Sequence, residues 1–114
     1  MSIEDFIGKA TKRKKKDSEV KETDIEDHFC KFAKRNKCNA LKLVMLRKKG
    51  FPDRTILCPK GRIFFIEFKK KGESQSAPQK AIQKILVGLG FEYHVCDQIG
   101  QAENILDNFL AFDE

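Results

Sequence analysis

The clearest structural signal lies in residues 50–69, which read GFPDRTILCPKGRIFFIEFK. Two apolar runs, 54–58 and 62–69, flank a turn at residues 59–61, so we predict an antiparallel β-hairpin. Each run carries an acid where a strand is usually apolar: Asp53 lies at the mouth of the first run and Glu67 inside the second. Because a buried carboxylate without a partner is costly, Glu67 should have a cation or hydrogen-bond donors nearby.

The side chains of the second run should alternate between the two faces of a sheet. One face carries Ile63, Phe65, Glu67 and Lys69, and the other carries Phe64, Ile66 and Phe68. Glu67 and Lys69 are therefore predicted to point the same way. The alternative to a functional site is a structural Glu67–Lys69 ion pair on an open sheet face.

A first helix is predicted over residues 23–37, where Ile25, Phe29, Phe32 and Ala33 recur at helical spacing. Thr23 and Glu26 match the Ser/Thr-x-x-Glu capping box. Glu26 would lie at the border of the buried stripe, where it can reach a site between helix and sheet. The alternative is that Glu26 only completes the capping box.

The other segments alternate between strand and helix patterns. Residues 40–46 predict a strand that is mostly buried on both faces, and residues 91–96 predict another. Ser76, Pro78 and Gln79 open a second helix, which stops at Gly88 or Gly90. Its expected buried stripe comprises Ala81, Ile82, Ile85, Leu86 and Leu89. A terminal helix over residues 102–112 should turn Ile105, Leu106, Phe109 and Leu110 inward. The predicted order is helix, three strands, helix, strand, helix.

Length and charge favour one small, basic α/β domain. The chain has 114 residues, 40% of them apolar, and a net charge of +6. We predict a flexible arm over residues 1–19, which holds five consecutive basic residues, and a single domain over residues 20–114. Nucleic acid is the leading class of partner, although modest basicity can simply aid solubility.

The chain shows neither a run of about 20 apolar residues nor a secretory signal, so a soluble, cytoplasmic protein is expected. Its four cysteines form no Cys-x-x-Cys pair and are expected to be reduced. A zinc site made of His28, Cys30, Cys38 and His94 would match no common ligand spacing.

Asp53, Glu67 and Glu26 would supply acid oxygens from two strand ends and a helix. Hard divalent ions such as Mg²⁺ or Mn²⁺ bind a few such oxygens together with water. A lysine beside the ion, here Lys69, can orient a water molecule and stabilise negative charge on a phosphate. These residue types predict phosphodiester hydrolysis.

The motif residues resemble the Pro-Asp…(Asp/Glu)-x-Lys signature of the restriction-endonuclease-like nuclease superfamily. Within that superfamily, residues 50–54, residues 65–69, Gly72 and the helix start at residues 76–79 are similar to the VRR-NUC family, and Glu26 matches its helical acid. The similarity runs from about residue 22 to residue 97. Phe51 and Phe68 depart conservatively from the aliphatic residues that are frequent there.

The resemblance implies a central mixed β-sheet flanked by helices in the order αβββαβα. It implies that Asp53, Glu67 and the backbone carbonyl of Phe68 hold Mg²⁺ or Mn²⁺, with Glu26 bound directly or through water. Lys69 would attend the attacking water, and Gln79 would orient Lys69 or the site. Stand-alone members, often viral or bacterial, resemble Holliday-junction resolvases in acting as homodimers on branched DNA.

Several basic residues are candidates for contacts to DNA: Lys12, Arg13, Lys14, Lys42, Arg47, Lys48, Lys49, Arg54, Lys70 and Lys71. Two other functions stay open, a catalytically silent nucleic-acid-binding module and an interaction domain that pairs with a larger nuclease or helicase. DNA and RNA are not distinguished. For a dimer interface, the candidates are Ile3, Phe6 and Ile7 or the terminal helix with Phe109 and Phe112.

Overall fold

A four-stranded mixed sheet forms the centre of the computed structural model, which describes residues 20–43 and 49–112. The strands are β1 (Asn39–Leu41), β2 (Arg54–Leu57), β3 (Ile63–Phe68) and β4 (Glu92–Cys96), in that spatial order. β1–β2 and β2–β3 are antiparallel, whereas β3–β4 is parallel. The predicted hairpin and mixed sheet are confirmed, with the short 3-10 turn η2 (Pro59–Gly61) joining β2 to β3.

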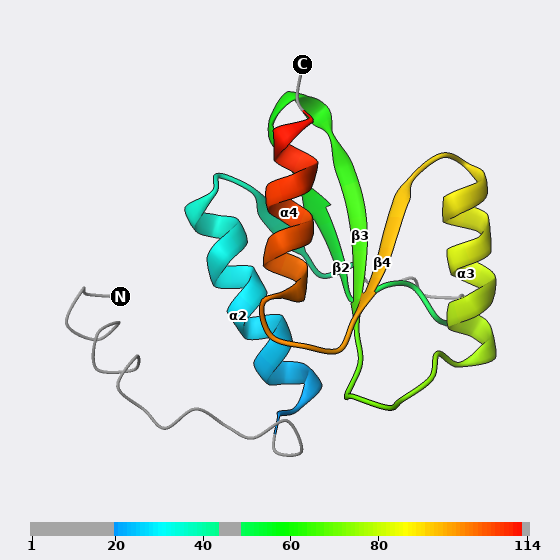
Figure 1. Cartoon of the computed structure of the whole chain (residues 1–114). Coiled ribbons are helices and arrows are strands. Elements are labelled where there is room, and N and C mark those ends of the chain that lie inside the picture. Colours follow the sequence, from blue (N-terminus) through cyan, green and yellow to red (C-terminus); the bar gives the residue numbers. More distant parts are fainter. Residues whose placement is uncertain (1–19, 44–48, 113–114) are drawn as a thin grey trace.

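Helices cover both faces of this sheet (Figure 1). α2 (Glu22–Arg35) and α4 (Gln101–Ala111) lie on one face, and α3 (Ala77–Gly88) lies on the other beside β4. Phe64, Ile66 and Phe68 pack in the larger core under α2 and α4. Phe65 packs in the smaller core under α3. The predicted alternation along β3 is therefore confirmed.

α2 begins one residue earlier than predicted, and its cap differs. The Lys21 backbone N–H donates to Asp24 Oδ2 at 2.9 Å, so Asp24 rather than Glu26 is the capping acid. The proposed Thr23–Glu26 capping box is wrong, because Thr23 already lies inside the helix. Glu26 is thereby released from a capping role. The helix ends at Arg35, two residues before the end of the predicted range.

The prediction of a strand buried on both faces at residues 40–46 is wrong. β1 has three residues and lies at the edge of the sheet, paired only with β2 among the described strands. Leu41 and Leu43 are 39% and 45% exposed because nothing in the described chain covers that edge. Residues 44–48 lie outside the described residues, as does the predicted arm over residues 1–19.

α3 starts as predicted but packs through a narrower face. Gln79 N–H donates to Ser76 Oγ at 3.3 Å and Ser76 N–H donates to Gln79 Oε1 at 2.8 Å, which completes the capping box. Ile82 and Leu86 are buried, whereas Ala81, Ile85 and Leu89 are exposed. The five-residue stripe is therefore wrong in three positions, because α3 rests on the sheet margin near β4 and none of the other described helices lies beside it.

α4 follows the prediction closely. Leu106 and Phe109 are buried, and Ile105 and Leu110 pack partly buried against the same core. Among the described residues, no helix has the length and apolar character needed to cross a membrane.

Candidate functional site

Glu67 is the centre of the candidate site. It lies near the end of β3, between β2 and β4, with none of its surface exposed. The Tyr93 hydroxyl donates to Glu67 Oε1 at 2.7 Å. The other oxygen, Oε2, is buried and has no hydrogen-bond partner among the described residues. The alternative of a Glu67–Lys69 pair on an open face is wrong, because the Glu67 carboxylate is fully buried.

Tyr93 was not among the predicted site residues. Burial raises its pKa, and the hydrogen bond to Glu67 and the charges of Glu67 and Asp53 raise it further, while Gln75 opposes the shift. The hydroxyl therefore stays protonated and donates to the carboxylate. Sequence reasoning missed Tyr93 because it faces Glu67 only through the parallel pairing of β4 with β3, which local patterns do not specify.

Asp53 joins the same cluster from the residue before β2. Its Oδ2 accepts the Phe68 backbone N–H at 2.7 Å. Extending the pairing of Arg54 with Ile66 by one residue places Asp53 opposite Glu67. The two acids predicted from the hairpin are thus brought together, with the Tyr93 hydroxyl beside them.

The segment that carries Asp53 is held against the start of α3. Gly50 has φ +90°, and a Cβ there would lie 2.4 Å from the Pro78 carbonyl carbon. Only glycine allows so close an approach. Phe51 packs edge-on against Phe65 with ring centroids 5.8 Å apart. These contacts fix the strand entrance from which Asp53 projects.

Lys69 continues β3 by one residue, and its backbone N–H donates to Cys96 O at 2.8 Å. Its half-buried side chain shares a strand face with Glu67 by alternation. Glu22 lies near this end of the strand, because the Lys70 backbone N–H donates to Glu22 Oε1 at 3.4 Å. Burial and a hydrogen bond with Glu73 raise the pKa of Glu22, while the Lys70 N–H and the Lys69 charge lower it.

Glu22 is therefore the helical acid that the structure places close to Lys69. It lies one turn before Glu26 on α2, so the i, i+4 spacing could have signalled it. The structure does not bring Glu26 to the Glu67 cluster. Glu26 Oε2 accepts Arg54 Nε at 2.6 Å, and Arg54 lies on the α2 face of β2, opposite to the face of Glu67.

The remaining predicted site residues are Gln79 and the basic residues that were candidates for DNA contacts. The Gln79 side-chain oxygen caps α3, so its role toward Lys69 stays a prediction. Lys42, Lys49, Lys70 and Lys71 are exposed, whereas the Arg54 guanidinium is held by Glu26 and by Ala40 O at 3.0 Å. The remaining predicted DNA contacts lie outside the described residues, namely Lys12, Arg13, Lys14, Arg47 and Lys48.

The donor set fits a hard divalent ion. The described residues include no group of three or more His, Cys, Asp or Glu side chains that could hold a metal. Mg²⁺ needs fewer, because it is commonly bound through one or two carboxylates and water. Asp53 supplies one carboxylate, and Glu67 Oε2 is a buried oxygen that lacks a partner. A cation beside these oxygens would offset the cost of burying Glu67.

The cysteines offer no competing zinc centre within the described residues. All four thiols are free, and Cys38 Sγ lies 3.6 Å from Cys58 Sγ inside the larger core. Burial raises the pKa of Cys58 to about 12 and that of Cys96 to about 12. These thiols therefore behave as small buried apolar groups.

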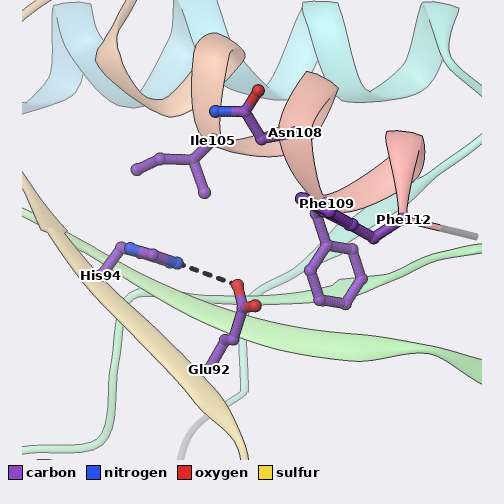
Figure 2. Close-up of a pocket in the computed structure, with 6 residues that line it drawn as sticks. All are labelled: Glu92, His94, Ile105, Asn108, Phe109 and Phe112. Carbon is purple, nitrogen blue, oxygen red and sulfur yellow. Dashed lines mark hydrogen bonds and ion pairs between the residues drawn. The ribbon is translucent and has the colours of Figure 1, made fainter.

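A cavity of about 210 Å³ lies on the other face of the sheet, between β4 and α4 (Figure 2). Its lining comprises Glu92, His94, Ile105, Asn108, Phe109 and Phe112. His94 Nε2 lies 3.1 Å from Glu92 Oε2. None of the predicted site residues lines this cavity, so the candidate site is the Glu67 cluster.

One sequence relative and one solved structure are similar to this chain. No protein-family model matches the chain. It is 32% identical over 78 residues to "Putative nuclease p44" of Acyrthosiphon pisum secondary endosymbiont phage 1, covering 68% of this chain and 84% of the relative. A solved structure described as a VRR_NUC domain matches with a TM-score of 0.72 and 19% identity, covering 79% of this chain and 98% of that one.

Proposed function

This chain belongs to the VRR-NUC family of nucleases, and we propose that it is a Mg²⁺- or Mn²⁺-dependent endonuclease that hydrolyses DNA phosphodiester bonds. One observation carries the proposal. Glu67 is fully buried beside Asp53, with one oxygen held by Tyr93 and the other without a partner among the described residues.

In this proposal, Asp53, Glu67 and the Phe68 carbonyl hold the ion. When bound, the ion would polarise the phosphate and lower the pKa of water. The Asp53–Phe68 hydrogen bond fixes the Asp53 carboxylate relative to β3. Lys69 supplies a positive charge on the Glu67 face, where it can orient the attacking water and offset charge that grows on the phosphate.

The helical acid can be assigned by experiment. Glu26 was predicted from the sequence, but its carboxylate is paired with Arg54, whereas Glu22 reaches the end of β3 near Lys69. We therefore place Glu22 ahead of Glu26 for this role. Glu22→Gln should then lower cleavage more than Glu26→Gln, and the reverse order would restore the sequence-based assignment. Melting temperatures of both variants control for loss of the Arg54 ion pair.

We further propose that the substrate is branched DNA and that the protein acts as a homodimer. A two-fold dimer presents two sites to opposed strands, which suits a four-way junction. Exposed apolar side chains on α3 and after α4 are available for such an interface, including Ile85, Leu89 and Phe112, which are 50%, 70% and 78% exposed.

The test is cleavage of labelled single-stranded, duplex, flap and four-way-junction DNA, with Mg²⁺, Mn²⁺ or EDTA. Paired, symmetric nicks in the junction would establish a resolvase, and cutting mainly of flaps would exclude that substrate class. Asp53→Ala should abolish cleavage while DNA binding persists. If the wild-type protein binds DNA but never cuts it with either ion, the protein is a silent binding module.

A further inference from the structure

We infer that Tyr93 is a positioning residue that holds Glu67 so that its free oxygen faces the metal, an inference that rests on the proposed function. The Tyr93 hydroxyl donates to Glu67 Oε1 at 2.7 Å, and Oε2 is the buried oxygen without a partner among the described residues. One oxygen of the carboxylate is thus fixed and the other is left for a ligand.

The Tyr93 ring is itself held in place. It is 8% exposed and packs with Phe65, Ile82 and Leu86 under α3. Its backbone is fixed by parallel pairing, which sets Tyr93 beside Phe65, two residues before Glu67. Because a packed aromatic ring has few alternative rotamers, its hydroxyl is a stationary donor.

The arrangement also explains why an anionic Glu67 is tolerated at this position. A buried carboxylate needs donors, yet a carboxylate with both oxygens saturated by protein groups would have none left for an ion. Tyr93 gives one donor to one oxygen. Partners of this kind orient metal ligands, and their removal typically weakens metal affinity roughly 10- to 100-fold.

The competing explanation is that the hydrogen bond only satisfies the hydroxyl of a buried tyrosine. Tyr93→Phe separates the two, because it removes the hydroxyl and keeps the ring. If Tyr93 positions Glu67, Mn²⁺ affinity measured by calorimetry should fall roughly 10- to 100-fold. Glu92→Gln is the matched control, since Glu92 is one residue away on the same strand and faces the opposite side of the sheet.

A second measurement uses the wild-type protein alone. Tyr93 is the single tyrosine of the chain, which has no tryptophan, so the tyrosine band of the near-ultraviolet spectrum, which lies at longer wavelength than phenylalanine absorbance, reports on this residue. Titration with Mg²⁺ should shift the tyrosine band, with the same midpoint as Mg²⁺ binding by calorimetry. Glu67→Gln should remove the saturable shift, and Glu92→Gln should keep it. The absorbance readout tests the role of Tyr93 even if the Tyr93→Phe variant does not fold.

The outcomes separate the inference from the function on which it rests. Tyr93→Phe with unchanged Mn²⁺ affinity, or a tyrosine band unmoved at saturating Mg²⁺, would overturn the role of Tyr93 even if the wild-type protein cleaves DNA. Wild-type protein that neither binds Mn²⁺ nor cuts DNA would overturn both. A roughly 10- to 100-fold loss of Mn²⁺ affinity in Tyr93→Phe but not in Glu92→Gln supports both the role of Tyr93 and the proposed metal dependence.

Discussion

Asp53 and Glu67 bring two acids into one corner of the sheet, and the Tyr93 hydroxyl bonds to one of the four carboxylate oxygens. Two like charges in a poorly hydrated site repel each other, and a cation between them relieves that repulsion. The free energy of unfolding should therefore depend on divalent ions. Single substitutions at this corner can show whether the acids act as ligands.

Asp53→Asn should abolish stabilisation by metal. The amide oxygen can still accept the Phe68 N–H, so the apo variant should melt at or above the wild-type temperature, because one of the repelling charges is gone. Mn²⁺ at 100 times its dissociation constant should stabilise the wild-type protein by about 2.7 kcal/mol and the variant by almost nothing. Thermal melts with Mn²⁺ and with EDTA test this, and equal rises in both proteins would contradict it.

Gly50→Ala should destabilise the fold strongly. Its Cβ would lie 2.4 Å from Pro78 C and 2.6 Å from Gln79 N, and φ is +90°. We expect a loss of roughly 3 kcal/mol or more, by backbone strain and overpacking together.

Gly72→Ala is the matched control for Gly50→Ala. Gly72 has nearly the same φ, +88°, and a Cβ there would meet nothing within 4 Å. It should cost only about 1–2 kcal/mol, the price of the left-handed conformation. Urea unfolding gives both values, and equal losses would show that the contact with α3 contributes nothing.

Among the elements, α3 has a starting point that the sequence specifies clearly and a buried face that the sequence specifies poorly. Ser76 and Gln79 cap it as predicted because capping is local chemistry. The buried face is decided by tertiary contacts, and only Ile82 and Leu86 face the sheet. Apolar spacing alone does not reveal that Ile85 and Leu89 stay exposed, with no helix of the described residues covering them.

This orientation predicts a contrast between two neighbouring isoleucines. Ile82 is 9% exposed and Ile85 is 50% exposed. Ile82→Ala should cost about 2–4 kcal/mol, and Ile85→Ala should change stability by at most about 0.5 kcal/mol. Urea unfolding at two protein concentrations tests both. A cost for Ile85→Ala that grows with concentration would indicate that a second copy covers this face.

The hairpin and the acids on it were predictable because their signals lie within twenty residues. Asp53 and Glu67 meet through an antiparallel pairing with a short turn, which the sequence specifies locally. Tyr93 reaches Glu67 through a parallel pairing formed after an intervening helix, so no local pattern reveals it. For the proposed helical acid, the sequence pattern does not distinguish Glu22 from Glu26, because the pairing of Glu26 with Arg54 is a tertiary contact between α2 and β2.

At the scale of the whole chain, the net charge of +6 and the block at residues 12–16 bear on DNA affinity. Each phosphate neutralised by a lysine or arginine releases counterions, so the logarithm of affinity falls with the logarithm of salt concentration at a slope of about 0.9 per phosphate. If the predicted arm contacts DNA, its five basic residues should account for part of that slope.

Replacing residues 12–16 with glutamine should lower the salt slope by up to about four to five. The binding assay is fluorescence anisotropy on a four-way junction between 50 and 300 mM NaCl, in the Asp53→Asn background so that no DNA is cut. The control replaces five exposed lysines, Lys31, Lys34, Lys37, Lys80 and Lys84. Both variants lose five positive charges, which lowers the net charge from +7 in the Asp53→Asn background, one more than the wild-type +6, to +2. Equal slopes in the two variants would show that overall charge, rather than contact by residues 12–16, sets the affinity.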